Sequence, residues 1–141
     1  MKLLNGPLGF TLLAAALLAG HAEPARAGDV SNARLDCYVD TYAFDVPTPG
    51  ECYSVWTPGT ANNPSVAVFS VAGLPAGSYA YQWRNLENGS TPCGNQSYCL
   101  VSIATETRGD GEASLSVTVT DTQTGAQKVA TAYAYYFDGY N

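Results

Sequence analysis

The segment Glu112–Asp121, EASLSVTVTD, alternates apolar residues with serines and threonines along its length. Ala113, Leu115, Val117 and Val119 occupy the odd positions, and hydroxyl side chains lie between them. Successive side chains of a β-strand point to opposite faces, so this pattern predicts a strand with one buried face and one face in water. A chain that contains such a strand needs a second layer to cover the apolar face.

A second run, Lys128–Phe137, KVATAYAYYF, follows a turn at Gly125 and completes a predicted β-hairpin. Its alternate positions give an alanine-rich face and a face that carries Val129, Thr131, Tyr133, Tyr135 and Phe137. We expect Tyr133, Tyr135 and Phe137 to lie in the core. That choice leaves Tyr136 and Tyr140 exposed.

Upstream, short β-rich runs are separated by glycine, proline, asparagine and aspartate, and no long helical period appears after residue 27. The predicted strands in this part are Asp36–Phe44, Cys52–Trp56, Ser65–Val71, Ser78–Arg84 and Cys99–Thr105. With the hairpin they make about seven strands with turn signals at nearly regular spacing. This pattern predicts an all-β, antiparallel β-sandwich.

The run Ser78–Arg84, SYAYQWR, directs its two tyrosines and Trp83 to one face of the predicted strand. A buried tryptophan in the third strand is the packing centre of immunoglobulin-like sandwiches, and we expect Trp83 to have this role. The alternative is that Gln82, Arg84 and the neighbouring loops form the rim of a binding site.

The stretch AGSYAYQW, followed downstream by GDGEASLSVTVTDTQTG, resembles bacterial immunoglobulin-like and PKD-type domains of secreted proteins. The resemblance covers roughly residues 65–136. It departs from the PKD pattern after Trp83, where RNLENG replaces a W-D-F-G-D-G turn, and in the loop between Cys93 and Cys99. The resemblance implies an immunoglobulin-like sandwich with a binding or spacer role, and it names no ligand.

Residues 1–27 have the form of a secretory signal peptide. Lys2 supplies the positive charge, an apolar run through Leu18 follows, and Ala25-Arg26-Ala27 offers small residues at the two positions that a signal peptidase reads. A transmembrane anchor is the alternative, but the apolar run is short for that role. We therefore expect one domain, residues 28–141, that is secreted to the periplasm or the extracellular space without inserting into the membrane.

The four cysteines, Cys37, Cys52, Cys93 and Cys99, all lie after the expected signal peptide. An even number of cysteines in an exported chain predicts two disulfides. Of the three possible pairings we favour Cys37–Cys52 with Cys93–Cys99, because both close short loops. A zinc site is the rival interpretation, and the spacing of the cysteines does not fit it.

The chemistry available to the chain is narrow. Its single histidine, His21, lies in the expected signal peptide, which excludes histidine-dependent nucleophiles and the usual zinc hydrolase sites. The net charge of −6 argues against nucleic acid and anionic lipid as partners. Paired carboxylates remain as a route to hydrolysis. A calcium site at Asp110, Glu112 and Asp121 is an alternative to solvated acids. We expect no enzymatic activity, no cofactor and no metal.

The favoured hypothesis is a small exported binding module for an extracellular or envelope protein or glycan. Tyrosine and tryptophan suit binding surfaces because they offer a large contact area at a small loss of conformational entropy. Trp56, Tyr136 and Tyr140 are therefore the candidate recognition residues, and Arg84 lies at the candidate rim.

The alternative is an inhibitor of secreted hydrolases. In that hypothesis a rigid loop, CGNQSYC, presents Asn95, Gln96 and Tyr98 to an active site. The sequence also contains Arg108-Gly109-Asp110, the tripeptide that integrins recognise, although glycine and aspartate are ordinary turn residues.

Overall fold

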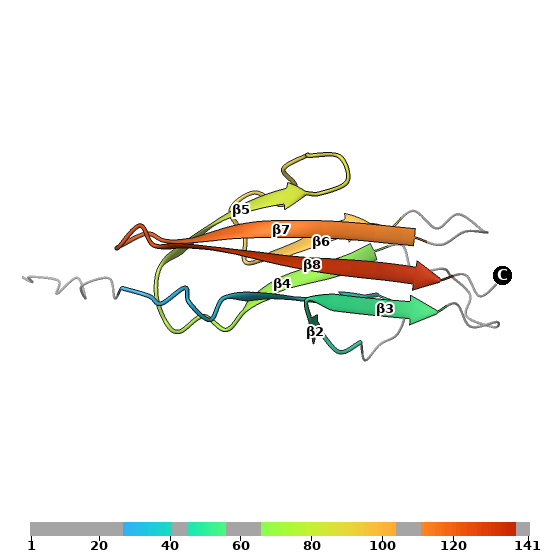
Figure 1. Ribbon diagram of the computed structural model, residues 1–141, viewed down its shortest axis with the longest axis horizontal. Helices are drawn as coiled ribbons and strands as arrows, with labels where there is room; N and C mark the ends of the chain where they lie inside the picture. Colours follow the sequence, from blue (N-terminus) through green and yellow to red (C-terminus); the bar gives the residue numbers. More distant parts are fainter. Residues whose placement is uncertain (1–26, 41–44, 56–65, 104–110, 138–141) are drawn as a thin grey trace, which may run out of the picture.

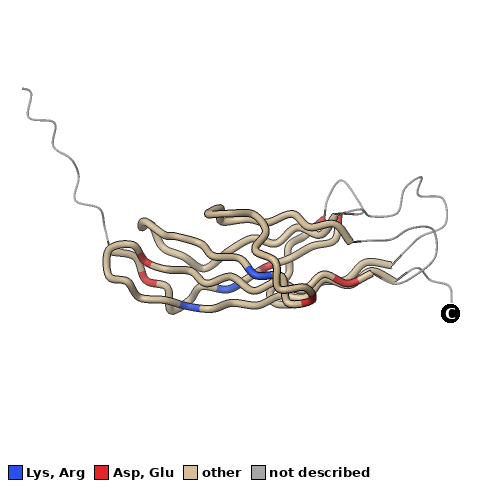
Figure 2. The backbone as a smooth tube through the Cα atoms, turned by 90° about the horizontal axis from the view of Figure 1, so that it is seen from above, with Lys and Arg blue, Asp and Glu red and all other residues tan. Residues whose placement is uncertain are grey.

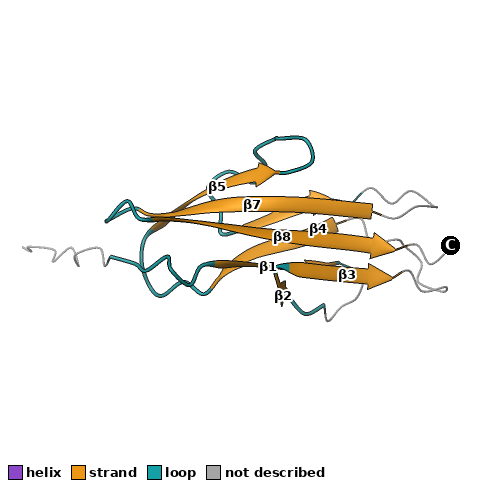
Figure 3. Cartoon of the chain, viewed as in Figure 1, coloured by secondary structure: helices purple, strands orange, loops and turns teal. Residues whose placement is uncertain are grey.

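The computed structural model describes residues 27–40, 45–55, 66–103 and 111–137, which form strands and loops (Figure 3). Eight strands make two four-stranded sheets that pack on each other (Figure 1). Their bounds are β1 Arg34–Val39, β2 Thr48–Pro49, β3 Glu51–Val55, β4 Val66–Ala72, β5 Tyr79–Asn85, β6 Tyr98–Ser102, β7 Gly111–Asp121 and β8 Gln127–Phe137. In these described ranges no helix is long and apolar enough to cross a membrane.

The first sheet has the strand order β2-β1-β4-β6, and the second has the order β3-β8-β7-β5. Every pairing is antiparallel except that of β3 with β8. β4 lies between β1 and β6, as the run Ser65–Val71 predicts with apolar residues on both faces. The all-β, mostly antiparallel sandwich is confirmed, with the two-residue β2 as an additional strand.

The chain crosses from one sheet to the other at Gly50. On one side of it, Thr48 pairs with Cys37 in the first sheet, and on the other, Glu51 pairs with Tyr133 in the second. Gly50 itself donates to the carbonyl of Leu35 (2.9 Å) and accepts from the amide of Tyr133 (3.0 Å). Its φ of +75° lies in the left-handed region that glycine adopts without a steric penalty.

Both predicted disulfides are present, and they connect different parts of the fold. Cys37–Cys52 joins β1 of the first sheet to β3 of the second, just after the crossing at Gly50. Cys93–Cys99 closes the short loop that leads into β6. Two intramolecular disulfides are consistent with an oxidising, extracellular or periplasmic location.

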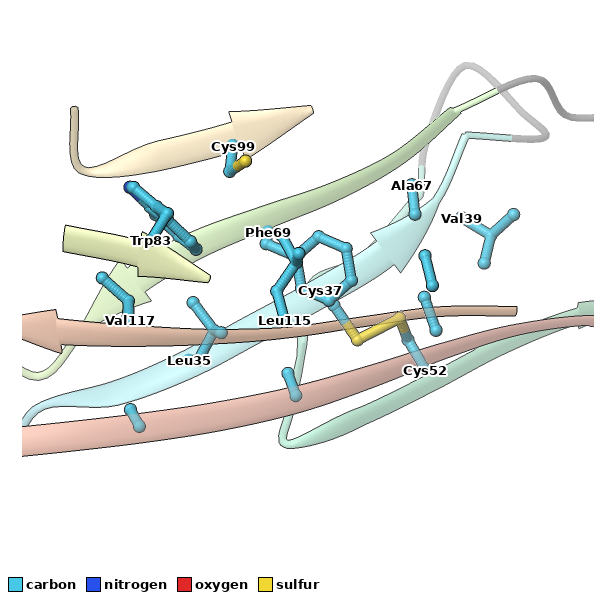
Figure 4. Close-up of a cluster of buried hydrophobic side chains, with 14 of the residues drawn as sticks. Leu35, Cys37, Val39, Cys52, Ala67, Phe69, Trp83, Cys99, Leu115 and Val117 are labelled. Atoms are coloured by element: carbon cyan, nitrogen blue, oxygen red, sulfur yellow. A yellow bond between two sulfur atoms is a disulfide. The ribbon is translucent and has the colours of Figure 1, made fainter. Parts of the chain in front are cut away.

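The core fills the space between the sheets (Figure 4). Its largest fully buried side chains include Phe69 from β4 and Trp83 from β5, with Leu115 and Val117 from β7. Phe69 pairs with Cys37 on one side and with Cys99 on the other, so each disulfide has one sulfur beside this ring. The burial of Trp83 in the core is confirmed.

The alternation predicted for residues 112–121 is also confirmed, since Ala113, Leu115, Val117 and Val119 are all buried. The prediction for β8 is wrong. Ala130, Ala132, Ala134 and Tyr136 face the core, whereas Val129, Tyr133 and Phe137 are exposed and Tyr135 is only partly covered.

The pairing of β8 with β7 explains this reversal. Cross-strand partners share a face, and the register places Ala132 opposite Leu115 and Ala130 opposite Val117. The first sheet also comes close to β8, because the Sγ atom of Cys37 lies 3.4 Å from the carbonyl oxygen of Tyr133. The core face of β8 therefore carries alanines at positions 130, 132 and 134 and one aromatic ring, Tyr136, near the end of the strand, whereas Tyr133, Tyr135 and Phe137 lie on the outer face.

Candidate binding surface

The outward face of β3 and β8 carries a continuous row of aromatic side chains. We call Tyr53, Tyr133, Tyr135 and Phe137 the aromatic strip. The register places Tyr53 beside Tyr135, and Val55 beside Phe137 at the end of the strip. Tyr53 is 71% exposed, and the rings of Tyr135 and Phe137 stack with their centroids 6.5 Å apart. Exposed aromatic area of this extent is typical of an interaction surface.

Two carboxylates flank the aromatic strip. Glu51 pairs with Tyr133 on the β3 side, and Glu112 pairs with Tyr135 on the β7 side. Partial burial raises the pKa of the Tyr135 hydroxyl, and the negative charges of Glu112 and Glu51 raise it further. Tyr135 therefore remains a neutral hydrogen-bond donor at physiological pH, between carboxylates that accept.

The rest of this outer face is different in composition. On β7 the outward positions beyond Glu112 carry serine and threonine, and on β5 they carry Ala80, Gln82 and Arg84. Figure 2 shows how sparse the charged residues are along the described chain, in which the basic residues are Arg34, Arg84 and Lys128. The aromatic strip is thus confined to the β3–β8 half of the sheet.

A groove of about 400 Å³ opens beside the strip, lined by residues of β1, of β3 and of the segment 45–48. Glu51 and Tyr53 belong to both the groove and the surface of the strip. The groove, called here the edge groove, is lined by Tyr38, Val39, Asp45, Val46, Thr48, Glu51, Cys52, Tyr53 and Ser54. The Thr48 hydroxyl donates to the carbonyl of Glu51 (2.7 Å) and so holds the chain where it turns into β3.

A second ordered feature is the Cys93–Cys99 loop, called here the strap. The indole Nε1 of Trp83 donates to the carbonyl of Gln96 (2.8 Å), and the amide of Tyr81 donates to Oδ1 of Asn95 (2.6 Å). Ser97 accepts a further bond from the amide of Val71 (2.8 Å). The strap therefore lies against Trp83 and is hydrogen-bonded to both sheets.

The structure does not bring the sequence-predicted site residues together. Tyr136 is 1% exposed, so it belongs to the core and not to a recognition surface. Arg84 is exposed on β5, two strands away from β8. In the strap, Asn95 and Gln96 form the structural bonds just described, and Tyr98 is half-exposed on the first sheet. Trp56, Tyr140 and the tripeptide Arg108-Gly109-Asp110 lie outside the described residues.

Sequence reasoning placed three members of the strip in the core and did not consider Tyr53. One signal could have found them, because the strip face of β8 carries the hydroxyls of Thr131, Tyr133 and Tyr135, and the opposite face carries alanines. Polar oxygens on every second residue indicate the face that meets water.

The alternative calcium site finds no support in the described part of the chain. Glu112 and Asp121 stand near opposite ends of β7, about 30 Å apart at the usual rise per residue. Asp110 is not among the described residues. Within the described ranges, no three metal-ligating side chains come together.

Comparison of the chain with protein-family models, with curated proteins and with solved structures finds no match.

Proposed function

We propose that the protein is a small exported, non-catalytic binding module, and that the aromatic strip is its ligand-binding surface. The observation that carries this proposal is the outward position of four aromatic side chains on β3 and β8, next to a core that takes alanines from the same strand. Leaving these rings in water forfeits the free energy of burying them, which amounts to about 2 kcal/mol for each large apolar side chain. A bound partner would recover it.

The chemistry of the strip favours an uncharged glycan as the ligand. Flat tyrosine and phenylalanine faces suit the C–H faces of sugar rings, and the hydroxyls of tyrosines offer hydrogen bonds. Glu51 and Glu112 accept hydrogen bonds from sugar hydroxyls, and their charges repel anionic polymers. The edge groove continues this surface and offers space for a further sugar unit.

Two features support an immunoglobulin-like type for the sandwich. Trp83 is buried between the sheets, and the Cys37–Cys52 disulfide joins one sheet to the other, and antibody domains have a buried tryptophan and an inter-sheet disulfide as well. The disulfides and the signal-like segment 1–27 together support export. These features agree with a module that works outside the cytoplasm.

The test is binding to polysaccharides. The full chain is expressed in an export-competent bacterium, and the folded product is assayed by gel retardation in soluble neutral polysaccharides and by depletion on insoluble ones. We expect retention on at least one neutral polymer, and a loss of affinity of about tenfold or more for Tyr53→Ala and for Tyr135→Ala. The matched control is Val129→Ala, on the same face of β8 but beyond the strip, which should bind as the parent does.

Three results would contradict the proposal. The first is retention that Tyr53→Ala and Val129→Ala reduce equally. The second is the absence of retention on every neutral polymer. The third is selective capture of a protein through the strip, which would retain the module but overturn the glycan as its ligand.

The inhibitor hypothesis has one observation in its favour, the rigidity of the strap. The disulfide and the bonds to Trp83, Tyr81 and Val71 hold it in one conformation, and Tyr98 is half-exposed beside it. A preorganised loop binds with a smaller entropic loss. If the strap acts on a hydrolase, then Tyr98→Ala abolishes inhibition and Tyr53→Ala does not; the glycan proposal requires the reverse for binding.

A further inference from the structure

Gly28 occupies a closely fitted slot at the end of the sandwich. Its amide nitrogen lies 3.0 Å from Oδ2 of Asp121, a residue 93 positions away in the sequence. A Cβ atom on Gly28 would overlap the ring of Tyr79, so only glycine fits without movement of that ring. Gly77 closes the slot, since a Cβ there would lie 3.0 Å from the Cα of Gly28.

Asp121 is an unusual partner because its side chain is fully buried. Oδ1 accepts from the amide of Gln123 (2.8 Å), and Oδ2 accepts from the hydroxyl of Thr124 (2.8 Å) in addition to Gly28. These bonds, that of Gln123 first, keep the pKa of the carboxyl below its usual range, so the group is an anion. All of these partners are neutral as long as Gly28 is an amide.

No cationic side chain compensates this charge among the residues that the structure describes. There the ion pair is Arg34–Asp36, on β1 of the first sheet. A buried carboxylate without a counter-charge is unfavourable, and a positive group at hydrogen-bond distance relieves that cost.

We propose that Gly28 is the amino terminus of the processed protein, and that its α-ammonium group is the counter-charge of Asp121. The pattern Ala25-Arg26-Ala27 places the scissile bond between Ala27 and Gly28. A signal peptidase adds one water across this bond, so that Ala27 leaves with the new carboxylate. The nitrogen of Gly28 becomes an amine, which takes a proton at neutral pH.

The consequence is a fold that is completed by its own processing. In the precursor, the Gly28 nitrogen donates one neutral hydrogen bond to Asp121. In the processed chain the same nitrogen carries a positive charge and has additional protons to donate, at the same position. A charge-assisted hydrogen bond is stronger than a neutral one, and more so in a buried setting. The processed domain is therefore more stable than any form that retains residues before Gly28.

The first experiment identifies the terminus. The full chain is exported from a bacterium, and the intact mass of the folded product gives the processing position. We expect Gly28 as the first residue. A product that begins at another residue overturns the proposal.

The second experiment compares this product with a variant that carries one serine inserted between Ala27 and Gly28. Processing after Ala27 then leaves Gly28 as an amide, with the charge displaced by one residue. All eight described strands lie after residue 28, so both products contain the complete fold. We expect the thermal midpoint of the insertion variant to be lower by about 5 °C or more. Equal midpoints overturn the proposal.

The pH dependence of the difference between the two thermal midpoints distinguishes an effect of the α-ammonium charge from a steric effect of the inserted serine. A nearby anion raises the pKa of an α-amine above its ordinary value of about 7.7–8.0. Its stabilisation is present in full below that ordinary value and is lost as the pH rises through the raised one. Both proteins contain the other titratable and charged groups of the adjoining segments, so the difference between midpoints removes their contributions. These groups are Asp29 beside Gly28, Tyr79, Tyr81 and Arg84 of β5, Glu112 of β7, and Lys128, Tyr133, Tyr135 and Tyr136 of β8. A difference that stays constant from pH 6 to 10 overturns the ion pair.

The last experiment repeats this comparison in the Asp121→Asn background. This substitution should abolish the pH-dependent part of the difference in thermal midpoint between the native and the inserted terminus. Persistence of that part in Asp121→Asn would overturn the assignment of Asp121 as the partner. If this variant does not fold, because Asp121 also organises the turn before β8, Thr124→Ala leaves the carboxylate in place and must retain the pH-dependent difference.

Discussion

Two strands of the second sheet, β5 and β8, have the same kind of sequence, but their alternating aromatic residues lie on opposite faces of the sheet. Both alternate aromatic residues with smaller ones, as YAYQW in β5 and AYAYYF in β8. In β5 the alternation ends in a fully buried Trp83. In β8 the aromatic alternation faces water, and alanines face the core. The periodicity of a strand thus defines two faces, and the layer that packs against it decides which face is buried.

The layer opposite each strand accounts for the difference. β5 is at the edge of its sheet, where the strap arches over the core and supplies a carbonyl for the indole nitrogen of Trp83. β8 lies inside its sheet, and Cys37 of the first sheet comes close to its backbone. A large ring fits under the strap, whereas the middle of β8 faces the core with the small side chains of Ala130, Ala132 and Ala134.

The largest expected effect is at Trp83. Trp83→Ala removes the largest side chain of the core and leaves the strap without its main anchor, so the free energy of unfolding should fall by about 3–5 kcal/mol. Urea denaturation measures this loss. Gln82→Ala, its exposed neighbour in the same strand, should change stability by less than about 0.5 kcal/mol. Comparable losses for the two variants would refute the burial pattern of β5.

The adjacent residues Tyr135 and Tyr136 sharpen the comparison within β8. Tyr136→Ala should lower the free energy of unfolding by about 3 kcal/mol or more, because its side chain is buried. Tyr135→Ala should cost clearly less, about 1 kcal/mol, because its ring is only partly covered. If Tyr135→Ala proves to be the more destabilising variant, then the aromatic face of β8 is the buried one.

Enlarging an alanine tests the narrow space beneath β1. Ala132 is fully buried opposite Leu115, so Ala132→Leu should destabilise the fold by about 1–3 kcal/mol through overpacking. Thr131→Leu, one position away on the outer face, provides the control and should be nearly neutral. Thermal unfolding of the two variants measures the contrast. A neutral Ala132→Leu would mean that β8 has room for larger side chains.

The smallest effect concerns the ionisation of Tyr135. Its raised pKa means that the folded state favours the neutral hydroxyl, so this contribution to stability is complete below the ordinary tyrosine pKa and is lost as the pH rises above it. Tyrosinate absorbance, compared between the parent and Tyr135→Phe, isolates this group. Glu112→Gln should lower its pKa, whereas Glu87→Gln, outside the strip, should leave it unchanged. The same titration for both variants would exclude the electrostatic contribution of Glu112.

Much of the fold was predictable from the sequence because its signals are local. The strict alternation of residues 113–119, the apolar run of β4 and the spacing of the cysteines each depend on neighbours in the chain. The predicted strand ends agree with the observed ones to within one or two residues where the structure describes both.

The candidate site was not predictable in the same way. The aromatic strip depends on the parallel pairing of β3 with β8, which places Tyr53 beside Tyr135 although they are far apart in the sequence. The bond between Gly28 and Asp121 likewise joins residues that are 93 positions apart in the sequence. In β8 both faces satisfy the alternation rule, and the pairing of Ala132 with the buried Leu115 determines which face lies in the core. Contacts of this kind form only when distant strands pair and the two sheets pack, so a local sequence pattern does not indicate them.

The arrangement of the ends also has a mechanical consequence. The blue segment at the start of the described chain and the end of β8 lie at opposite ends of the long axis (Figure 1). Tension applied between them runs along the strands, so the hydrogen bonds of β8 to β3 and β7 are loaded in shear and share the force. The Cys37–Cys52 disulfide prevents the segment between these residues from extending under the applied force. A module that is held at one end and engaged at the other would therefore transmit a pull through many bonds at once.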